Sequence, residues 1–472
     1  MLKRTKIVAT ISDRRCDVEF LRTLYESGMN VVRLNTAHQN LEQAKAVIDN
    51  VRKVSDTIAI LVDTKGPEIR TSSFGEEIKV SKGDRLKLYG DPNGVSKGDS
   101  LYLSYPGIVS EVPVGSCILI DDGDIEVIVA DKTEDCLLCQ VDNSGVIKLR
   151  KSINIPNIHI NLPSLTEKDI EFVKFAIDNK LDFIAHSFVR KKEDVIEIKK
   201  ILEEYKSPIK IIAKIENQQG VDNIDEILDH TYGIMVARGD LGIEISAEKI
   251  PIIQRRIVKK CIESKKPVII ATQMLHTMIE HPRPTRAEIS DIANAIYQRV
   301  DAIMLSGETA YGAYPVEAVK IMTRVAQEVE VNLEPDPKQK LVRVNNEITA
   351  TLARSAVRAC GSLPIKAIVI DTLSGRTGRY LSSFRGKIPI YAMCYRHHVM
   401  RQLSLSYGVI AEYMEPRTTR DHFLTDAMSV IEEQSELLPE DLVLVIGGSF
   451  GPRDGASFME ISQVKNLLKS GK

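Results

Sequence analysis

Polar side chains that could do chemistry follow directly after short apolar runs at several places in the chain. The set is Arg33, Asn35, Asp63, Lys65, Lys214, Glu216, Arg238, Asp240, Thr272, Ser306 and Glu308. Carboxylates, cations and hydroxyls gathered around one opening would bind an anionic substrate together with a divalent cation. Each residue alone is as readily a turn or cap residue at a strand end. The recurrence of the pattern after successive strands favours one shared site.

Lys214 and Glu216 stand two residues apart in the strand-like segment IIAKIEN. Side chains at this spacing point to the same face of a strand, so the ammonium and the carboxylate should lie together. A cation there would neutralise charge on a phosphoryl group in transfer and on an enolate that develops behind it. Glu216 and Asp240 are the predicted ligands of Mg²⁺ or Mn²⁺, since magnesium takes one or two carboxylates and fills its other positions with substrate oxygens and water. The alternative is a purely structural Lys–Glu pair.

The elements that must position these residues alternate between strand and helix. Eight apolar strands are expected, each followed by an amphipathic stretch: KIVATI, NVVRLN, IAILVD, LDFIAHSF, PIKIIAKIEN, YGIMVARGD, KPVIIATQM and VDAIMLSGE. Eight such units most simply close into a (β/α)8 TIM barrel, whose strands end at one face and place the polar side chains around its mouth. An open doubly wound sheet is the alternative.

Two further regions interrupt or follow this alternation. Residues 71–156 contain only short strands separated by turns, which predicts an all-β lid domain inserted into the α/β fold. The proline-punctuated stretch EPDPKQK reads as a linker before a third α/β region. We therefore expect a discontinuous catalytic barrel at 1–70 and 157–334, the inserted lid at 71–156, and a C-terminal α/β regulatory domain at 335–472.

Composition narrows the class of protein. The chain has 472 residues, 43% apolar and 27% charged, with a net charge of −2, so no bulk charge recruits nucleic acid or an anionic membrane. The N-terminal apolar run ends at Asp13, too early for a signal peptide, and no run reaches the roughly 18 residues of a membrane span. We expect a cytoplasmic protein.

The cysteines and the remaining histidines give weaker signals. Seven cysteines in a chain of this length do not indicate a disulfide framework. Cys136 and Cys139 have CxxC spacing but lie in a strand-like run, so we interpret them as strand residues, with a redox or metal role as the minor alternative. His397, His398 and His422 lack partners at ligand spacing and are interpreted as surface or helix-end residues.

Six motifs occur in a fixed order: LVDTKGPEIRT, IIAKIEN, GIMVARGDLG, ATQML, PRPTRAE and AIMLSGETA. In this order they resemble the pyruvate kinase family, from Lys6 to about Val331, with the insertion in the family's place. The C-terminal third resembles the family in layout more than in motif. The resemblance implies phosphoryl transfer from phosphoenolpyruvate to ADP, giving pyruvate and ATP in the last step of glycolysis. It also implies Mg²⁺, K⁺ and a homotetramer.

The resemblance also implies residue roles. Lys214, Thr272, Ser306 and Arg33 match catalytic positions, where Lys214 stabilises the phosphoryl group and the enolate, and Thr272 and Ser306 relay a proton to the enolate carbon. The predicted substrate-binding residues are Arg33, Lys214, Ala237, Arg238, Gly239, Asp240 and Thr272. The predicted nucleotide contacts are Asn35, His38, Arg70 and Lys151, and the predicted K⁺ ligands are Asn35, Asp63 and Thr64. Glu68 resembles the potassium-dependent form of the family.

The chain departs from the family pattern at a few positions. Ala37 replaces a serine that matches a K⁺ ligand, and its side chain supplies no oxygen. Asp13 replaces a proline beside the expected adenine position, and Tyr311 stands where a lysine is common, for which we have no explanation. Ser152 and Asn157 replace two glycines of the lid stretch, which bears on how the lid hinges.

The C-terminal segment IDTLSGRTGRY resembles the family's effector loop, which holds a sugar phosphate. Its predicted effector residues are Thr372, Ser374, Gly375, Arg376 and Thr377. Hydroxyls and N–H groups at the start of a helix suit a phosphate, and an ordinary capped turn is the alternative. The segment GGSFGPRDGAS does not reproduce the family's second effector segment.

Two other classes of function compete with the kinase. A lyase or aldolase acting on phosphoenolpyruvate or pyruvate would also need the enolate and magnesium, but neither the lid nor Arg70 and Lys151. A ligand-sensing protein that kept only the site shape is disfavoured, because Lys214, Glu216 and Asp240 are all present. ADP-dependent formation of pyruvate separates the three.

Overall fold

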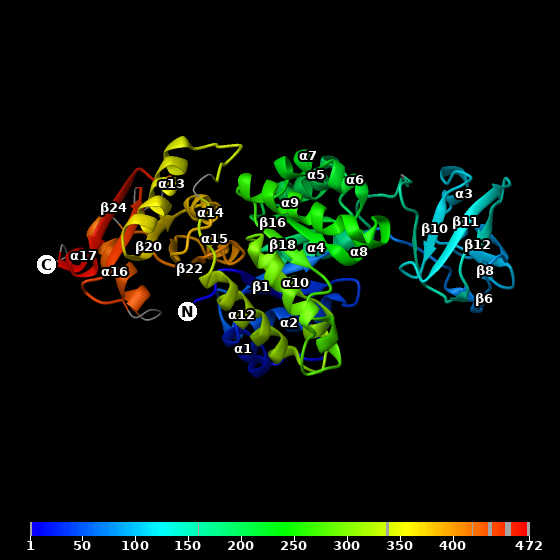
Figure 1. Ribbon diagram of the computed structural model, residues 1–472, viewed down its shortest axis with the longest axis horizontal. Helices are drawn as coiled ribbons and strands as arrows, with labels where there is room; N and C mark the ends of the chain where they lie inside the picture. Colours follow the sequence, from blue (N-terminus) through cyan, green and yellow to red (C-terminus); the bar gives the residue numbers. More distant parts are fainter. Residues whose placement is uncertain are drawn as a thin grey trace.

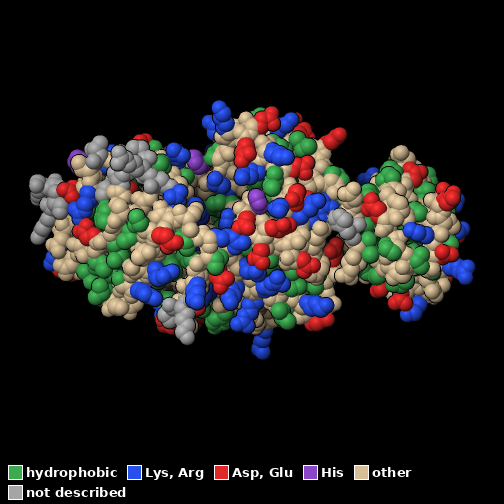
Figure 2. Space-filling view, turned by 90° about the horizontal axis from the view of Figure 1, so that it is seen from above, with side chains coloured by type: hydrophobic (Ala, Val, Ile, Leu, Met, Phe, Trp, Pro, Cys, Tyr) green, Lys and Arg blue, Asp and Glu red, His purple; other side chains and the backbone are tan. Residues whose placement is uncertain are grey.

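The computed structural model describes residues 2–158, 160–336, 339–417, 419–432, 437–448 and 455–469. Three bodies follow one another along the long axis of the molecule (Figure 1). A barrel lies in the middle, the inserted β-domain lies at one end and the C-terminal sheet lies at the other. Figure 2 shows basic and acidic side chains interspersed over these bodies on the face that it displays.

Eight parallel strands close into the barrel, which confirms the predicted TIM fold. The order around the barrel is β1-β19-β18-β17-β16-β15-β3-β2. The strands are β1 (Lys6–Thr10), β2 (Val31–Asn35), β3 (Ala59–Asp63), β15 (Phe183–His186), β16 (Lys210–Ile215), β17 (Gly233–Ala237), β18 (Val268–Ala271) and β19 (Ala302–Leu305). All eight are the strands expected from the sequence, and none belongs to an open sheet.

Helices surround the strands because their apolar faces need cover. The barrel helices are α1 (Val18–Glu26), α2 (Leu41–Val54), α4 (Glu167–Asp178), α5 (Lys192–Glu204), α6 (Gln218–Asp222), α7 (Ile224–His230), α8 (Arg238–Glu244), α9 (Ile250–Glu263), α10 (Arg286–Tyr297), α11 (Gly307–Ala310) and α12 (Pro315–Val331), with 3₁₀ turns at Ala247–Lys249 and His276–Ile279. One cluster of buried side chains fills the layer between strands and helices, and a smaller one fills the interior of the barrel. A capping box formed by Thr166 and Asp169 begins α4.

The inserted domain is built on a seven-stranded sheet of order β4-β14-β10-β11-β12-β7-β9, with two small two-stranded sheets beside it. Its elements are β4 (Ile69–Arg70), β5 (Phe74–Gly75), β6 (Ile78–Val80), β7 (Arg85–Tyr89), β8 (Val95–Ser96), β9 (Ser100–Tyr102), α3 (Ile108–Glu111), β10 (Cys117–Ile120), β11 (Ile125–Lys132), β12 (Cys136–Val141), β13 (Gly145–Ile147) and β14 (Ser152–Asn154). The one-turn helix α3 makes the domain mostly β rather than wholly β. Cys136 and Cys139 lie in β12 as free, buried thiols.

The C-terminal body is a five-stranded mixed sheet with helices on it. The sheet order is β22-β21-β20-β23-β24, and only β24 runs antiparallel to its neighbour. Its elements are α13 (Glu347–Ser362), β20 (Ile365–Thr372), α14 (Arg376–Ser383), β21 (Ile390–Cys394), α15 (His397–Leu403), β22 (Val409–Tyr413), α16 (Arg420–Glu432), β23 (Leu442–Gly447), β24 (Phe458–Gln463) and α17 (Val464–Lys469). His397 and His398 begin α15, as expected of helix-end residues.

Among the described residues, each body has hydrophobic clusters made mainly of its own side chains, and Leu405 of the C-terminal body joins the cluster inside the barrel. We propose the three-domain division on this basis. The strand β4 belongs to the inserted sheet by pairing, because Ile69 lies opposite Ile153 of β14. Within the described part of the chain, no helix combines the length and the apolarity needed to cross a bilayer.

Candidate active site

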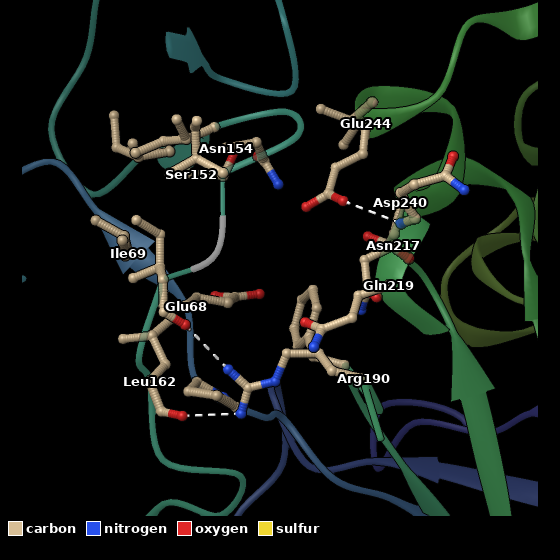
Figure 3. Close-up of a pocket in the computed structure, with 18 of the residues that line it drawn as sticks. Glu68, Ile69, Ser152, Asn154, Leu162, Arg190, Asn217, Gln219, Asp240 and Glu244 are labelled. Atoms are coloured by element: carbon tan, nitrogen blue, oxygen red, sulfur yellow. Dashed lines mark hydrogen bonds between the residues drawn. The ribbon is translucent and has the colours of Figure 1, made fainter. Parts of the chain in front are cut away.

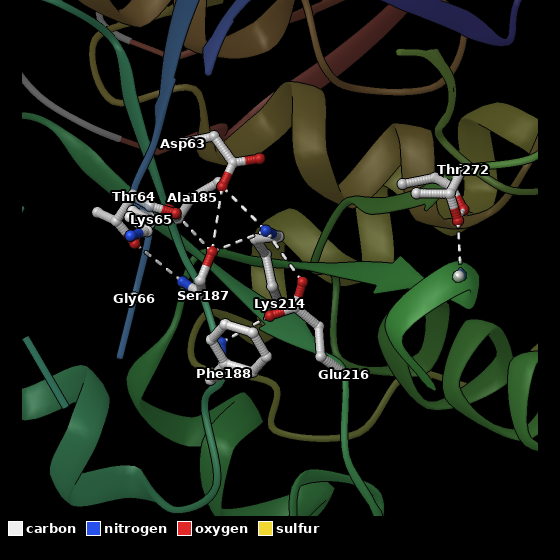
Figure 4. Close-up of polar contacts among 12 residues, drawn as sticks. Asp63, Thr64, Lys65, Gly66, Ala185, Ser187, Phe188, Lys214, Glu216 and Thr272 are labelled. Carbon is white, nitrogen blue, oxygen red and sulfur yellow. Dashed lines mark hydrogen bonds and ion pairs between the residues drawn. The ribbon is translucent and has the colours of Figure 1, made fainter. Parts of the chain in front are cut away.

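Lys214 lies at the centre of a buried polar network at the carboxyl ends of the barrel strands (Figure 4). Its Nζ is 3.0 Å from an oxygen of Asp63, 3.0 Å from an oxygen of Glu216, and 2.7 Å from the Ser187 hydroxyl. Burial opposes the charge of the ammonium, but the carboxylates of Asp63 and Glu216 outweigh it and raise the pKa of Lys214. Lys214 is therefore a fixed, permanently charged cation.

Asp63, at the end of β3, joins this lysine to a second cation. Its other oxygen accepts a 2.6 Å hydrogen bond from Arg33 Nε, and Arg33 also donates to the Thr10 hydroxyl at 3.0 Å. Burial alone would raise the pKa of the Asp63 carboxyl, yet Arg33 and Lys214 together lower it. Arg33, Asp63 and Lys214 thus lie side by side although they come from three different strands.

Glu216 and Asp240 face each other from the ends of neighbouring strands. Glu216 accepts a hydrogen bond of 2.6 Å from the Phe188 N–H and stays buried beside Lys214. Burial, reinforced by the charge of Asp240, raises the pKa of Glu216 to about 7, and burial also raises the pKa of Asp240. Beside the single charge of Lys214, two neighbouring carboxylates with raised pKa values form an environment that a divalent cation completes.

This pair fits magnesium by the chemistry of its donors. Two carboxylates leave the remaining octahedral positions to water and substrate oxygens, as magnesium prefers. The described residues contain no cluster of three or more acidic, histidine or cysteine side chains of the kind that holds a metal by protein alone. The site therefore suits a cation shared with an anionic ligand.

The predicted potassium ligands surround the same strand end. The Asn35 amide oxygen accepts a hydrogen bond from the Ala37 N–H at 3.2 Å, and the Thr64 hydroxyl accepts one from the Ser187 N–H at 3.0 Å. Both Asp63 oxygens are engaged by Lys214 and Arg33. Oxygen donors are present, but residue 37 adds none.

Ser187 was missed by the sequence analysis. It follows β15, donates from its hydroxyl to the Thr64 carbonyl at 2.6 Å and accepts from Lys214. Gly66 allows this packing, because a Cβ there would lie 3.0 Å from the Ser187 Cβ and 2.7 Å from the Phe188 ring. The available signal was the position of Ser187 directly after the apolar strand FIAH, the same rule that identified the other residues.

Thr272 lies on the other side of the mouth, after β18. Its φ is +67°, a left-handed conformation that is costly for a β-branched residue. The hydroxyl accepts from the Gly239 N–H at 2.8 Å and lies 2.7 Å from the Ala271 carbonyl. Hydrogen bonds at this conformation hold the hydroxyl beside the turn that carries Arg238 and Asp240.

Two predicted residues near Thr272 are also fixed by neighbours. Arg238 donates to the Thr272 carbonyl at 2.7 Å and pairs with Asp291 at 2.7 Å. The Ser306 N–H donates to Glu308 at 2.7 Å, at the end of β19. Ala237 ends β17, directly before Arg238. The predicted catalytic and substrate-binding residues together therefore come from the ends of five strands, β2, β16, β17, β18 and β19.

The predicted nucleotide contacts are less tightly gathered. Arg70 and Lys151 lie at the neck of the inserted domain, where Arg70 pairs with Glu68 at 2.6 Å and Lys151 with Asp121 at 2.9 Å. His38 is exposed beyond β2. A cleft of about 370 Å³ runs from this neck to Asp240 (Figure 3). It leaves room for a ligand between the inserted domain and the barrel.

Arg190 binds the segment 160–162, which lines this cleft. It donates to the Ile160 carbonyl at 3.1 Å and to the Leu162 carbonyl at 2.8 Å, as Figure 3 shows for Leu162.

Three of the positions that depart from the family pattern can be located in the structure. The Asp13 carboxylate accepts a hydrogen bond from the Gln43 side chain at 2.8 Å, and the Tyr311 side chain is 67% exposed. Asn157 has a φ of +64°, a left-handed conformation that glycine adopts at little cost, which explains the glycine of the family pattern at this position.

The predicted effector loop connects β20 to α14. Gly375 has a φ of +74°, and its N–H donates to the Thr372 hydroxyl at 2.9 Å. The Ser374 carbonyl accepts from Arg379 at 3.1 Å. The segment GGSFGPRDGAS lies mostly outside the described residues, at 449–454.

The fold and the site together define a class. Enzymes built on parallel barrels act at the face where these residues meet. Fixed cations beside buried carboxylates suit an enzyme that binds an anionic substrate with a divalent metal.

Comparison with known proteins identifies the family. The family model "Pyruvate kinase, barrel domain" matches residues 2–319, and "Pyruvate kinase, alpha/beta domain" matches residues 350–462. A pyruvate kinase of Borreliella burgdorferi is 47% identical over 99% of this chain and 98% of its own length, and one of Bacillus licheniformis is 42% identical over 100% of this chain and 82% of its own. A crystal structure of a pyruvate kinase from Cryptosporidium parvum, 35% identical, covers 98% of this chain and 96% of its own with a TM-score of 0.92. The chain belongs to the pyruvate kinase family and is a phosphotransferase.

Proposed function

We propose that the protein transfers the phosphoryl group of phosphoenolpyruvate to ADP through the residues at the barrel mouth. The observation that carries this proposal is the Lys214 ammonium, held 3.0 Å from both Asp63 and Glu216 beside Asp240. Phosphoryl transfer needs little covalent work from the protein, so positioning and charge compensation supply the catalysis.

The chain's own residues divide this work. Arg33 and Lys214 bind the phosphoryl oxygens, and Lys214 neutralises the enolate oxygen as the bond to phosphorus breaks. Thr272 and Ser306 then pass a proton to the enolate carbon, which gives pyruvate. The backbone from Ala237 to Asp240 orients the substrate carboxylate. Bound at Glu216 and Asp240, Mg²⁺ or Mn²⁺ would act as a Lewis acid on the substrate oxygens.

We also propose roles for the nucleotide-binding residues and for the inserted domain. Arg70 and Lys151, at the neck of the inserted domain, are placed to reach ADP phosphates, with Asn35 and His38 on the barrel side. Closure of the inserted domain over the cleft would exclude water, so that the phosphoryl group is not lost to hydrolysis. A monovalent cation at Asn35, Asp63 and Thr64 would add positive charge beside the transferred group. We further propose that the protein is cytoplasmic and forms a homotetramer. Light scattering, which measures the mass of the assembly, tests the oligomeric state.

One substitution tests the chemistry. Lys214→Met should lower kcat for ADP-dependent pyruvate formation by at least ~10²-fold, the scale of losing a main electrostatic stabiliser. Lys210→Met is the matched control, because Lys210 begins the same strand at the opposite end of the barrel. Equal loss in both variants would count against the assignment. Pyruvate release without ADP would indicate a lyase-type reaction instead.

We also propose that a sugar phosphate such as fructose 1,6-bisphosphate activates the enzyme at Thr372, Ser374, Gly375, Arg376 and Thr377. The left-handed Gly375 at the start of α14 supports this, since the first turn of a helix offers backbone N–H groups to a phosphate. The activator should lower the phosphoenolpyruvate concentration at half-saturation, and Thr377→Ala should weaken that response. No shift with any sugar phosphate would refute the proposal.

A further inference from the structure

A second cavity lies at the opposite end of the barrel from the candidate active site. It has a volume of about 350 Å³ and lies between the barrel and α14 of the C-terminal body, on the side where α9 ends and β17 begins. Its lining residues are Leu228, Asp229, Tyr232, Ser264, Lys265, Lys266, Arg343, Asn345, Arg376, Arg379 and Tyr380. We call it the interdomain cavity.

Positive charge dominates this lining. Its cationic residues are Lys265, Lys266, Arg343, Arg376 and Arg379, whereas Asp229 is its one acidic residue. Asp229 forms an ion pair with Arg343. The interdomain cavity therefore holds an excess of about four positive charges, counted from its lining at neutral pH.

Carbonyl groups, which carry no net charge, receive most of the described hydrogen bonds of these cations. Lys265 donates to the Val342 and Arg343 carbonyls at 2.9 and 2.8 Å. Lys266 donates to the Thr231 carbonyl at 2.5 Å, and Arg379 to the Ser374 carbonyl at 3.1 Å. These bonds fix the side chains in place, and the described hydrogen bonds and ion pairs of Lys265, Lys266 and Arg379 include no carboxylate.

The cations also repel one another across the interdomain cavity. Burial, together with the charges of Arg379 and Lys265, lowers the pKa of Lys266 to about 8. Burial likewise lowers the pKa of Lys265 to about 8, with Arg343 and Arg379 contributing. Like charges gathered in a partly buried cavity cost free energy unless an anion joins them.

Two tyrosines hold the cations in position. The Arg379 guanidinium lies 5.4 Å from the centre of the Tyr232 ring, and Lys265 Nζ lies 5.2 Å from that of Tyr380. The Tyr380 hydroxyl is bonded in turn to Asn345 at 2.8 Å. Tyr232 belongs to the barrel and Arg379 to the C-terminal sheet, so the arrangement is shared by both bodies.

We propose that the interdomain cavity binds a small phosphate-bearing anion that links the barrel to the C-terminal domain. Convergent Lys and Arg donors suit the several oxygens of a phosphate dianion, and the volume falls within the range of small-ligand sites. This site differs from the proposed effector loop, which uses hydroxyls and backbone N–H groups before α14, although Arg376 belongs to both. Arg379 connects them through its bond to Ser374.

Thermal unfolding of the full-length protein tests the proposal, with inorganic phosphate and pyrophosphate as probes against sodium chloride of equal ionic strength. Both probes should raise Tm above its value in chloride. Lys266→Met and Arg379→Gln should each weaken the apparent affinity for phosphate about tenfold, as expected when one charged donor is lost. Lys260→Met is the matched control, because it removes the same charge from α9 outside the cavity, where Lys260 pairs with Asp225.

Each outcome decides the proposal. In chloride, Lys266→Met should unfold at the wild-type Tm or above, because it removes a repelled charge. This shows that any lost phosphate response is not a folding defect. An undiminished phosphate response in both Lys266→Met and Arg379→Gln overturns the proposal. A response lost in Thr377→Ala but kept in the cavity variants assigns the anion to the effector loop and overturns it as well.

Discussion

At the scale of single residues, the Lys214 ammonium is held by oxygens from three strand ends: Asp63, Ser187 and Glu216. The two carboxylates supply charge, whereas the Ser187 hydroxyl supplies direction. Removing the hydroxyl should leave the lysine charged but free to move between the carboxylates. Charge compensation depends on the exact position of the Lys214 ammonium. The neutral Ser187 hydroxyl, which sets that position, therefore contributes more to catalysis than to stability.

Ser187→Ala should therefore lower kcat about tenfold, on the scale of one hydrogen bond to a charged group. The KM for ADP and the Tm should change little, because the strand β15 and its packing remain. Ser207→Ala, which removes a hydroxyl from the loop before β16, is the control. A fall in Tm that accounts for the lost activity would make Ser187 a structural residue and contradict its role in positioning Lys214.

Ala37 permits a test of the monovalent cation. The neighbouring donors Asn35, Asp63 and Thr64 are present, and position 37 lacks only the oxygen of a serine. Ala37→Ser should lower the K⁺ concentration for half-maximal activity about tenfold, the effect of one added ligand of hydrogen-bond strength. The comparison is a potassium titration of both proteins at constant ionic strength. Full wild-type activity without potassium or ammonium would show that no monovalent cation is needed.

The sequence predicted the charged residues of the site better than the neutral ones. Lys214 and Glu216 could be placed together from strand periodicity, and their 3.0 Å contact confirms that step. Ser187 could not be ranked above other strand-end serines, because its importance depends on the approach of β3 through Gly66, a contact far apart in sequence. The interdomain cavity could not be predicted from the sequence either, since its cations come from segments that meet only after folding.

At the scale of elements, strand order and the long strands were predictable, but short irregular elements were not. All eight barrel strands followed from apolar runs, because a buried parallel strand needs a continuous one. The one-turn helix α3 was missed, since four residues give no helical periodicity. The sheet membership of β4 depends on pairing between Ile69 and Ile153, which no local pattern encodes.

The inserted domain permits a prediction at this scale, because its core shares no residue with that of the barrel. Leu88, in β7, is fully buried there. Leu88→Ala should destabilise the inserted domain by about 2–5 kcal/mol through the cavity it leaves. Amide exchange should accelerate in β7 and β12 but not in β16, and kcat should fall as the cover over the cleft loosens.

The control for this experiment is Val95→Ala, because the Val95 side chain is 60% exposed in the same domain. It should change neither exchange nor kcat, since exposed substitutions are usually worth less than about 0.5 kcal/mol. Acceleration of exchange in β16 by Leu88→Ala would show that the two bodies unfold together. In that case the inserted domain would not be an independent lid.

At the scale of the whole molecule, ion pairs join the barrel to the C-terminal domain, among them Arg401 with Asp182 and the more deeply buried pair of Arg385 with Asp301. Arg385, after α14, contacts Asp301, before β19, through two hydrogen bonds of 2.9 and 2.5 Å, and both side chains are less than 5% exposed. Asp301 also accepts from the backbone N–H groups of Tyr407 and Val268. The strand β19 then leads directly to Ser306 at the barrel mouth, so this junction and the candidate active site share one rigid element.

Arg385→Met should destabilise the protein by about 3–5 kcal/mol, because it leaves the Asp301 carboxylate buried without its cation. Arg417→Met, which breaks the exposed pair with Asp426, should cost only about 0–1 kcal/mol. Urea unfolding of both variants measures the difference. Arg385→Met combined with Asp301→Asn should recover part of the loss, since no charge then remains buried and unpaired. If Arg385→Met cost no more than Arg417→Met, the Arg385–Asp301 pair would not stabilise the domain junction, and β19 would not carry a charge-dependent link between that junction and the barrel mouth.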